Sequence, residues 1–125
     1  MAKKSREFQV PTADIKRAIE GDAEKLVATA QMVGYHLKGR GLTTSQIRNI
    51  FGEVKRMEAS GYDRNRLILL KPRLAYAAGR HRGAVEDLRD VLVAAIDAVD
   101  DAARFKNFVN FFEAILAYHR EAGGK

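Results

Sequence analysis

Apolar residues recur at spacings of three and four along most of the chain, which is the period of an amphipathic helix. Five stretches show this pattern, each with polar residues on the opposite side. Their inward positions are Leu26, Ala30, Val33 and Leu37; Ile47, Ile50, Phe51, Val54 and Met57; Leu67, Leu70, Leu74, Ala77 and Ala78; Val85, Leu88, Val91, Leu92, Ala95, Ile96 and Val99; and Phe105, Phe108, Val109, Phe112, Ile115, Leu116 and His119. No alternating β-branched run bounded by hairpin residues occurs. The pattern predicts an all-α fold.

Polar and glycine residues indicate where the first helices begin and end. A short helix is expected after Pro11, and it ends at Gly21. Asp22 can begin the next helix by accepting a hydrogen bond from an unpaired backbone N–H. Thr43 and Gln46 have the spacing of a capping box, which predicts a further helix that continues to about Gly61.

The stretch from about Asp63 to His81 contains Pro72, one of only two prolines in the chain. Proline inside a helix clashes with the carbonyl four residues back, so Pro72 should kink this third helix or start a new segment, and we expect the kink. Short connections between the helices favour a compact antiparallel bundle of about five helices.

The chain of 125 residues is short enough for one domain. We expect a polar N-terminal arm over residues 1–11 and a single helical domain over residues 12–125. The basic start is not followed by an apolar stretch, and no run approaches 18 apolar residues, so neither a signal peptide nor a membrane span is expected. Because cysteine is absent, a reducing cytoplasm is the simplest location.

The residue types that perform catalysis are present without the spacing that catalysis needs. None of the serines lies in a Gly-x-Ser-x-Gly turn. His36, His81 and His119 are far apart, and each lies near an expected helix end, where a structural role suits it. No paired His or Glu-x-x-His spacing indicates a metal site. We therefore expect no catalytic residue, no metal and no cofactor.

The charge of the chain is unevenly distributed. Lys and Arg number 22 against 16 Asp and Glu, a net charge of +6. Residues 38–82 carry a net charge of +8, and residues 83–103 carry −5. The acidic segment is expected to be a solvated face or a surface that docks a basic neighbour. The basic segment indicates an acidic partner such as nucleic acid.

The basic residues of the middle segment fall into rows spaced by seven, which is two helical turns or about 10.5 Å. The predicted binding residues are Arg48, Lys55, Arg56, Arg66, Lys71, Arg73 and Arg80. Such rows can follow a phosphate backbone, although arginine and lysine also occupy ordinary solvent-facing helix surfaces. Outside the expected apolar stripes, the only nearby aromatic residues are Tyr62 and Tyr76. Tyr76 suits either the core or an interface, and the core is favoured. Contact with the backbone is therefore favoured over base stacking.

Three segments resemble a known family, the small subunit of type III-A CRISPR effector (Csm) complexes. They are LTTSQIRNIF at residues 42–51, LKPRLAYAAGR at 70–80 and FVNFFEAILAYH at 108–119. The resemblance implies a helical, non-catalytic protein of antiviral defence, present in several copies beside repeated RNase subunits and a large subunit. It also implies contact with the backbone of paired guide RNA and target RNA at Arg48, Lys71, Arg73 and Arg80. Lys55, Arg56 and Arg66 are predicted from their spacing alone.

Two other functions remain open at this point. One is a free-standing helical DNA-binding dimer, although the helix that begins at Thr43 lacks a short helix-turn-helix partner. The other is a small enzyme or ligand-binding bundle, which the missing site residues disfavour. The partners expected from the first interpretation are guide RNA, target RNA, the backbone and large subunits and other copies of the chain, with no membrane.

Overall fold

The computed structural model describes residues 8–125, so residues 1–7 of the predicted arm lie outside the described residues. Within this range there are seven α-helices, one 3₁₀ turn and no strand, which confirms the all-α fold. Five helices have twelve residues or more, and α1 and α4 are shorter. In chain order they are α1 (Thr12–Glu20), α2 (Ala23–Gly39), η1 (Thr44–Gln46), α3 (Arg48–Ser60), α4 (Arg64–Ile68), α5 (Leu70–His81), α6 (Ala84–Asp97) and α7 (Ala102–Glu121).

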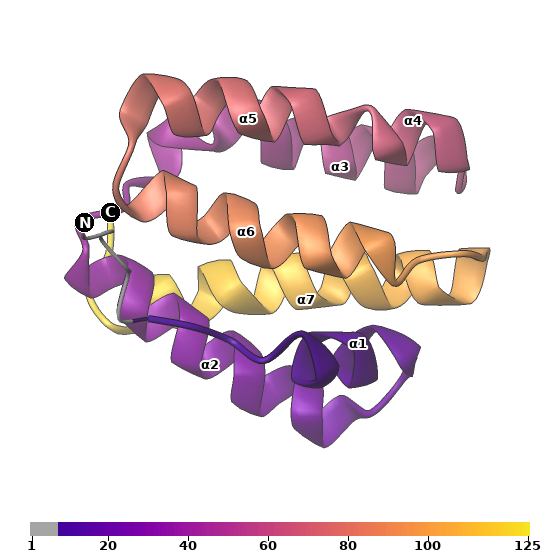
Figure 1. Cartoon of the computed structure of the whole chain (residues 1–125), viewed down its shortest axis with the longest axis horizontal. Helices are drawn as coiled ribbons and strands as arrows, with labels where there is room; N and C mark the ends of the chain where they lie inside the picture. The colour runs from indigo at the N-terminus through magenta and orange to yellow at the C-terminus, as the bar shows by residue number, and fades with distance from the viewer. Residues whose placement is uncertain (1–7) are drawn as a thin grey trace, which may run out of the picture.

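The helices form three tiers (Figure 1). The first tier holds α3, α4 and α5, the second holds α6 and α7, and the third holds α1 and α2. Successive long helices run antiparallel, as predicted, but α2 and α7 run side by side in the same direction. Gly21, just before α2, lies near Asn107, whereas Gly34 lies against Ile115 and His119.

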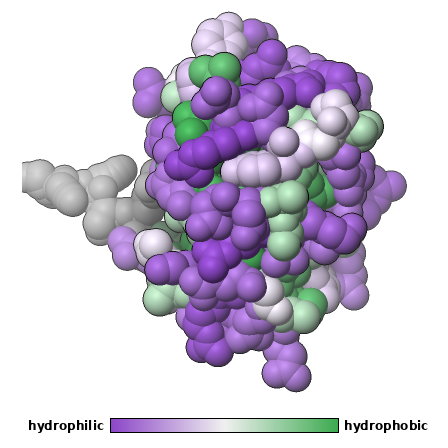
Figure 2. Space-filling view, turned by 90° about the vertical axis from the view of Figure 1, so that its right-hand side faces the viewer, coloured by the Kyte–Doolittle hydropathy of each residue, from purple (hydrophilic) through white to green (hydrophobic). Residues whose placement is uncertain are grey.

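The core is built around α7, which packs against α1, α2, α3 and α6. Phe108, Phe111 and Phe112 of this helix are fully buried, and the ring of Phe51 from α3 meets Phe112 edge-on at 5.1 Å between centroids. Each of the five predicted apolar stripes contributes buried residues to this one core. The surface at the end where α4 and α7 begin is mostly hydrophilic, with small scattered hydrophobic areas (Figure 2).

The seam between α2 and α7 is tightly packed. A Cβ atom on Gly34 would lie 2.7 Å from the carbonyl oxygen of Ile115, so only glycine allows this approach of the two backbones. At the end of the seam, the Nε2–H of the fully buried His119 donates to the carbonyl oxygen of Leu42 at 2.6 Å. At the other end, the Asn107 side chain donates to the carbonyl oxygen of Ile19 at 2.8 Å.

Two predicted helix starts are confirmed by their hydrogen bonds. The Asp22 side chain accepts from the backbone N–H of Lys25 at 3.0 Å. Thr43 and Gln46 form the reciprocal capping box. The box begins the 3₁₀ turn η1, however, and α3 itself begins only at Arg48.

The predicted single helix with a kink at Pro72 is not confirmed. The segment is instead two helices, α4 and α5, which meet at Leu69. Pro72 lies in the first turn of α5, where the missing backbone N–H costs little. The carbonyl with which its ring would clash in a continuous helix belongs to Ile68, the last residue of α4. The interruption therefore lies before the proline.

Candidate nucleic-acid interface

An open groove of about 810 Å³ runs between α3 and α5. One wall comes from η1 and α3, and the other comes from α5. Its lining residues are Ser45, Gln46, Asn49, Ile50, Arg56, Pro72, Arg73, Tyr76, Ala77, Arg80 and His81. Three of the seven predicted basic residues therefore share one concave surface, together with amide and hydroxyl side chains.

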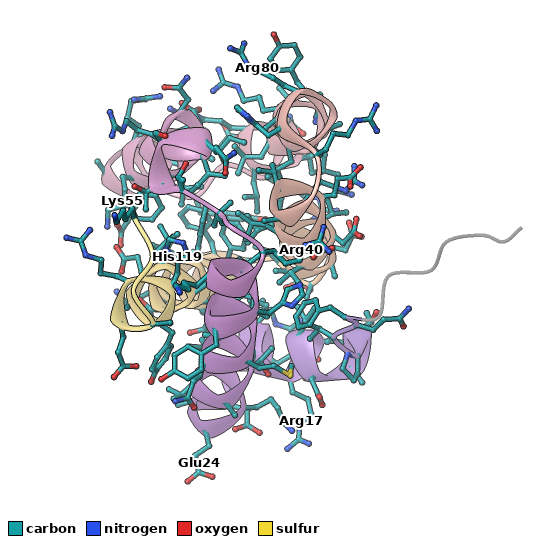
Figure 3. All side chains as sticks on the ribbon, turned by 90° about the vertical axis from the view of Figure 1, so that its left-hand side faces the viewer. Arg17, Glu24, Arg40, Lys55, Arg80 and His119 are labelled. Atoms are coloured by element: carbon teal, nitrogen blue, oxygen red, sulfur yellow. The ribbon has the colours of Figure 1, made fainter. Side chains whose placement is uncertain are left out.

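The sequence of α5 explains why its side chains line the groove. Leu70, Leu74 and Ala78 recur every four residues and are buried against the rest of the bundle. Arg73 and Arg80 lie on the opposite side, seven residues and about 10.5 Å apart, and both are exposed. Figure 3 shows Arg80 at the edge of the molecule, pointing outward.

Within residues 8–125, neither Arg73 nor Arg80 forms an ion pair or a side-chain hydrogen bond, which leaves both guanidinium groups available to an anion. Arg56 lies across the groove from them and contacts the carboxylate of Glu53 at 3.1 Å. The groove therefore holds more positive charge than its own carboxylates neutralise.

Two arginines, Arg56 of the groove wall and Arg66, share the carboxylate of Glu53. Its oxygens accept hydrogen bonds from Arg66 at 2.8 Å and from Arg56. The hydrogen bond from Arg66 is the main reason that the pKa of Glu53 lies below its ordinary value, and Arg56 adds to the effect against the opposing influence of burial. Arg66 does not line the groove; its guanidinium also donates to the Ser60 hydroxyl.

Two predicted lysines form ion pairs outside the groove. Lys55 contacts Glu58 and Glu113, and the hydrogen bond with Glu113 is the first cause of its raised pKa. Lys71 contacts Asp97 of α6. In Figure 3, Lys55 lies on a different side of the molecule from Arg80. The predicted row on α3 is therefore divided between two surfaces.

Arg48 lines a separate, mainly apolar hollow of about 340 Å³ between α3 and α7. The other lining residues are Thr44, Ile47, Phe51, Gly52 and Leu116. Arg48 is exposed and forms no ion pair with residues 8–125. Arg48 therefore does not share the groove.

The expectation that Tyr76 belongs to the core is wrong, because this side chain is 71% exposed and lines the groove. Two residues correspond to about 200° of rotation on a helix, so Tyr76 points away from the buried Leu74. Its spacing of three from Arg73 and four from Arg80 is the signal that places it with them. Sequence reasoning also missed Asn49 and His81, which have no distinguishing pattern.

The acidic segment is more involved in the fold than the sequence indicated. Asp87 is only 3% exposed and contacts His36 at 2.7 Å and Arg40 at 3.7 Å, so it cannot belong to a solvated face. Asp101 accepts from the backbone N–H of Arg104 and caps α7. Asp97, Asp100 and Asp90 remain on the surface or partly so.

Residues 8–125 hold neither a cluster of metal-ligating side chains nor a helix that could span a membrane. No group of three or more His, Asp and Glu side chains there could hold a metal ion. None of the helices in residues 8–125 has both the length and the apolar character needed to cross a membrane.

Comparison with known proteins gives one match. No curated protein and no solved structure is similar enough to be matched. A family model described as Csm2 Type III-A matches residues 20–125, which include the whole groove and all seven predicted basic residues. The chain therefore belongs to the Csm2 Type III-A family, the small subunits of type III-A CRISPR effector complexes.

Proposed function

We propose that the protein is a non-catalytic subunit that holds the sugar–phosphate backbone of guide and target RNA in the groove between α3 and α5. Sequence reading is then performed by base pairing between the two RNAs, and the protein recognises the charge and course of the backbone. Family membership supports the setting, in which several copies pack beside the repeated RNase subunits and the large subunit.

The observation that carries this proposal is the pair formed by Arg73 and Arg80. Both line one open groove, and neither has a carboxylate partner within residues 8–125. An unpaired guanidinium can offer two parallel N–H donors to one phosphate, and a separation of two turns lets the pair contact different phosphates of one strand. Lys55, Arg66 and Lys71 already have carboxylate partners, so they contribute less to the proposed contact.

A salt titration of RNA binding tests the proposal. We expect the purified chain to bind single-stranded RNA without sequence preference, and Arg73→Ala with Arg80→Ala to weaken this binding about tenfold or more. The slope of log affinity against log salt should fall by about 1.4, since each phosphate contact on a single strand contributes about 0.7. Adding Arg48→Ala is expected to abolish the binding that remains.

The matched control is Lys16→Ala with Arg17→Ala. These residues are on α1, and Figure 3 shows Arg17 at the opposite end of the molecule from Arg80. Both double variants lose two positive charges, so a loss from net charge alone would be equal in the two. Equal affinities of the groove variant and the control variant would refute the assignment of the groove.

A free-standing DNA-binding protein is the alternative function, and the same assay separates it. Tighter binding to a duplex DNA than to single-stranded RNA would favour that alternative. Co-purification of the chain with guide RNA and larger subunits is expected from the proposed function, and its absence from cells that express all the subunits would contradict it.

A further inference from the structure

Tyr76 differs from the other tyrosines in the part of the chain that the structure describes. Tyr35 meets the ring of Tyr118 edge-on, and Tyr62 contacts the ring of Phe105. Tyr76 has no ring contact and no hydrogen bond within residues 8–125, and it is the most exposed of the large hydrophobic residues. The ring of Tyr76 is therefore exposed to solvent, whereas other large apolar side chains of α5 are buried in the core.

Two arginines that have no ion pair within residues 8–125 flank Tyr76 on the surface of α5. Arg73 precedes it by three residues and Arg80 follows it by four, so all three side chains lie on one face of α5. An aromatic ring between two cations matches a single strand of nucleic acid, in which phosphates alternate with flat bases.

The opposite wall supplies groups of a different kind. Asn49 is exposed and forms no hydrogen bond through its side chain within residues 8–125, and Ser45 is exposed beside it. A side-chain amide has both hydrogen-bond donors and an acceptor, and the edge of a nucleobase likewise presents donors and acceptors. The groove therefore combines cations, a ring and the free amide group of Asn49 within one hollow of about 810 Å³.

We propose that Tyr76 stacks on an unpaired nucleobase of the RNA whose phosphates contact Arg73 and Arg80. This inference rests on the proposed function and specifies that the bound nucleotide is unpaired. Inside a continuous duplex both faces of a base are covered by neighbouring bases, so Tyr76 could not stack on it. The groove then prefers a nucleotide that is single-stranded or turned out of its duplex over a continuous double helix.

Stacking is tested with the full chain and three nucleic acids of equal length: a mixed-sequence single-stranded RNA, an abasic oligomer with the same ribose–phosphate backbone, and an RNA duplex. The variants are Tyr76→Leu, which removes the ring, and Tyr76→Phe, which keeps it. We expect Tyr76→Leu to weaken binding to the single-stranded RNA about five- to a hundredfold, with little change in the salt slope, and Tyr76→Phe to stay within about twofold.

The abasic oligomer supplies the internal control. It should bind the unaltered protein as weakly as the single-stranded RNA binds Tyr76→Leu, and the substitution should not weaken its binding further. Because Tyr76 is exposed, Tyr76→Leu should unfold at the temperature of the unaltered protein.

The outcomes separate this inference from the proposed function. If Tyr76→Leu binds the single-stranded RNA normally while Arg73→Ala with Arg80→Ala does not, stacking is wrong and backbone binding stands. If neither variant loses affinity, both are wrong. If Tyr76→Leu binds RNA normally but fails to co-purify with the other subunits, Tyr76 is a protein contact and the stacking proposal is overturned.

Discussion

The groove between α3 and α5 and the seam between α2 and α7 use polar groups in opposite ways. In the seam, the Nε2–H of His119 and the side chain of Asn107 both donate to backbone carbonyls of other elements. In the groove, Arg73, Arg80 and Asn49 have no partner within residues 8–125. The free polar groups of the groove are exposed and can accept a ligand, whereas the hydrogen bonds of the seam hold the fold together. Substitutions in the two regions should then affect different measurements.

The largest expected effect is on stability, from a change in the seam. Gly34→Ala would place a Cβ atom within 3 Å of the α7 backbone, which cannot move away as a flexible side chain could. We expect the free energy of unfolding, measured with urea, to fall by about 3 kcal/mol. RNA binding by the fraction that remains folded should be unchanged.

Gly39→Ala is the control for that change, since a Cβ atom at Gly39 would meet nothing within 4 Å. Its effect on the free energy of unfolding should be below about 1 kcal/mol and in the stabilising direction, because alanine is the better helix former. A similar loss of stability from both substitutions would mean that the backbones of α2 and α7 do not approach each other closely at Gly34.

An intermediate effect is expected from Glu53→Gln, which changes the balance of charge at the groove. The substitution removes the negative charge that Arg56 and Arg66 share, so RNA affinity should rise about two- to threefold. The free energy of unfolding should fall by up to about 1 kcal/mol at neutral pH, since both arginines of these ion pairs are accessible to solvent at the surface. An unchanged or lower affinity would show that these two arginines do not face the RNA.

The pH dependence of the same variant has a definite sign. Because the pKa of Glu53 is lowered in the folded protein, the stabilisation by its carboxylate is present above the pKa of the unfolded chain and is lost as the pH falls through the folded value. The difference in stability between the unaltered protein and Glu53→Gln should thus be greatest above about pH 5 and should narrow in more acidic solution. A constant difference from pH 7 to pH 3 would contradict the ion pairs as described.

The smallest effect is expected from Lys55→Ala and Lys71→Ala. Lys55 is paired with Glu58 and Glu113, and Lys71 with Asp97, so neither offers a free charge at the groove. Each substitution should change RNA affinity by less than about twofold and leave the free energy of unfolding nearly unchanged, because exposed ion pairs contribute little to stability. A tenfold loss of affinity from either one would extend the interface beyond the groove.

Much of the fold could be predicted from the sequence because its signals are local. The spacing of apolar residues predicted the long helices, and the Asp22 and Thr43 caps form as expected. The position of the break before Pro72 could not be fixed in this way, since a proline disturbs a helix over the four residues before it. The parallel course of α2 and α7 depends on packing between distant segments, which helical periodicity does not contain.

The sequence predicted that the candidate site is basic, but it predicted less well which basic residues line the groove. Spacing by seven found Arg73 and Arg80, which line the groove together. It also selected Lys55, and the family resemblance selected Lys71. The carboxylate partners of these lysines, Glu113 and Asp97, are 58 and 26 residues away along the chain. No local pattern reveals such a partner. The helical angle between Tyr76 and Leu74 indicates that Tyr76 is exposed. The apolar character of its ring nevertheless favoured a place in the core.

The seam between α2 and α7 also bears on how the protein is made. The hydrogen bond from Asn107 to Ile19 joins residues 88 positions apart, and that from His119 to Leu42 joins residues 77 apart. A ribosome releases α2 long before α7, so the apolar side of α2 remains uncovered during most of synthesis. Pairing of such distant segments makes folding slower than in a bundle held by neighbouring helices. The last twenty or so residues therefore complete the core, and a chain that is cut before α7 should aggregate rather than fold.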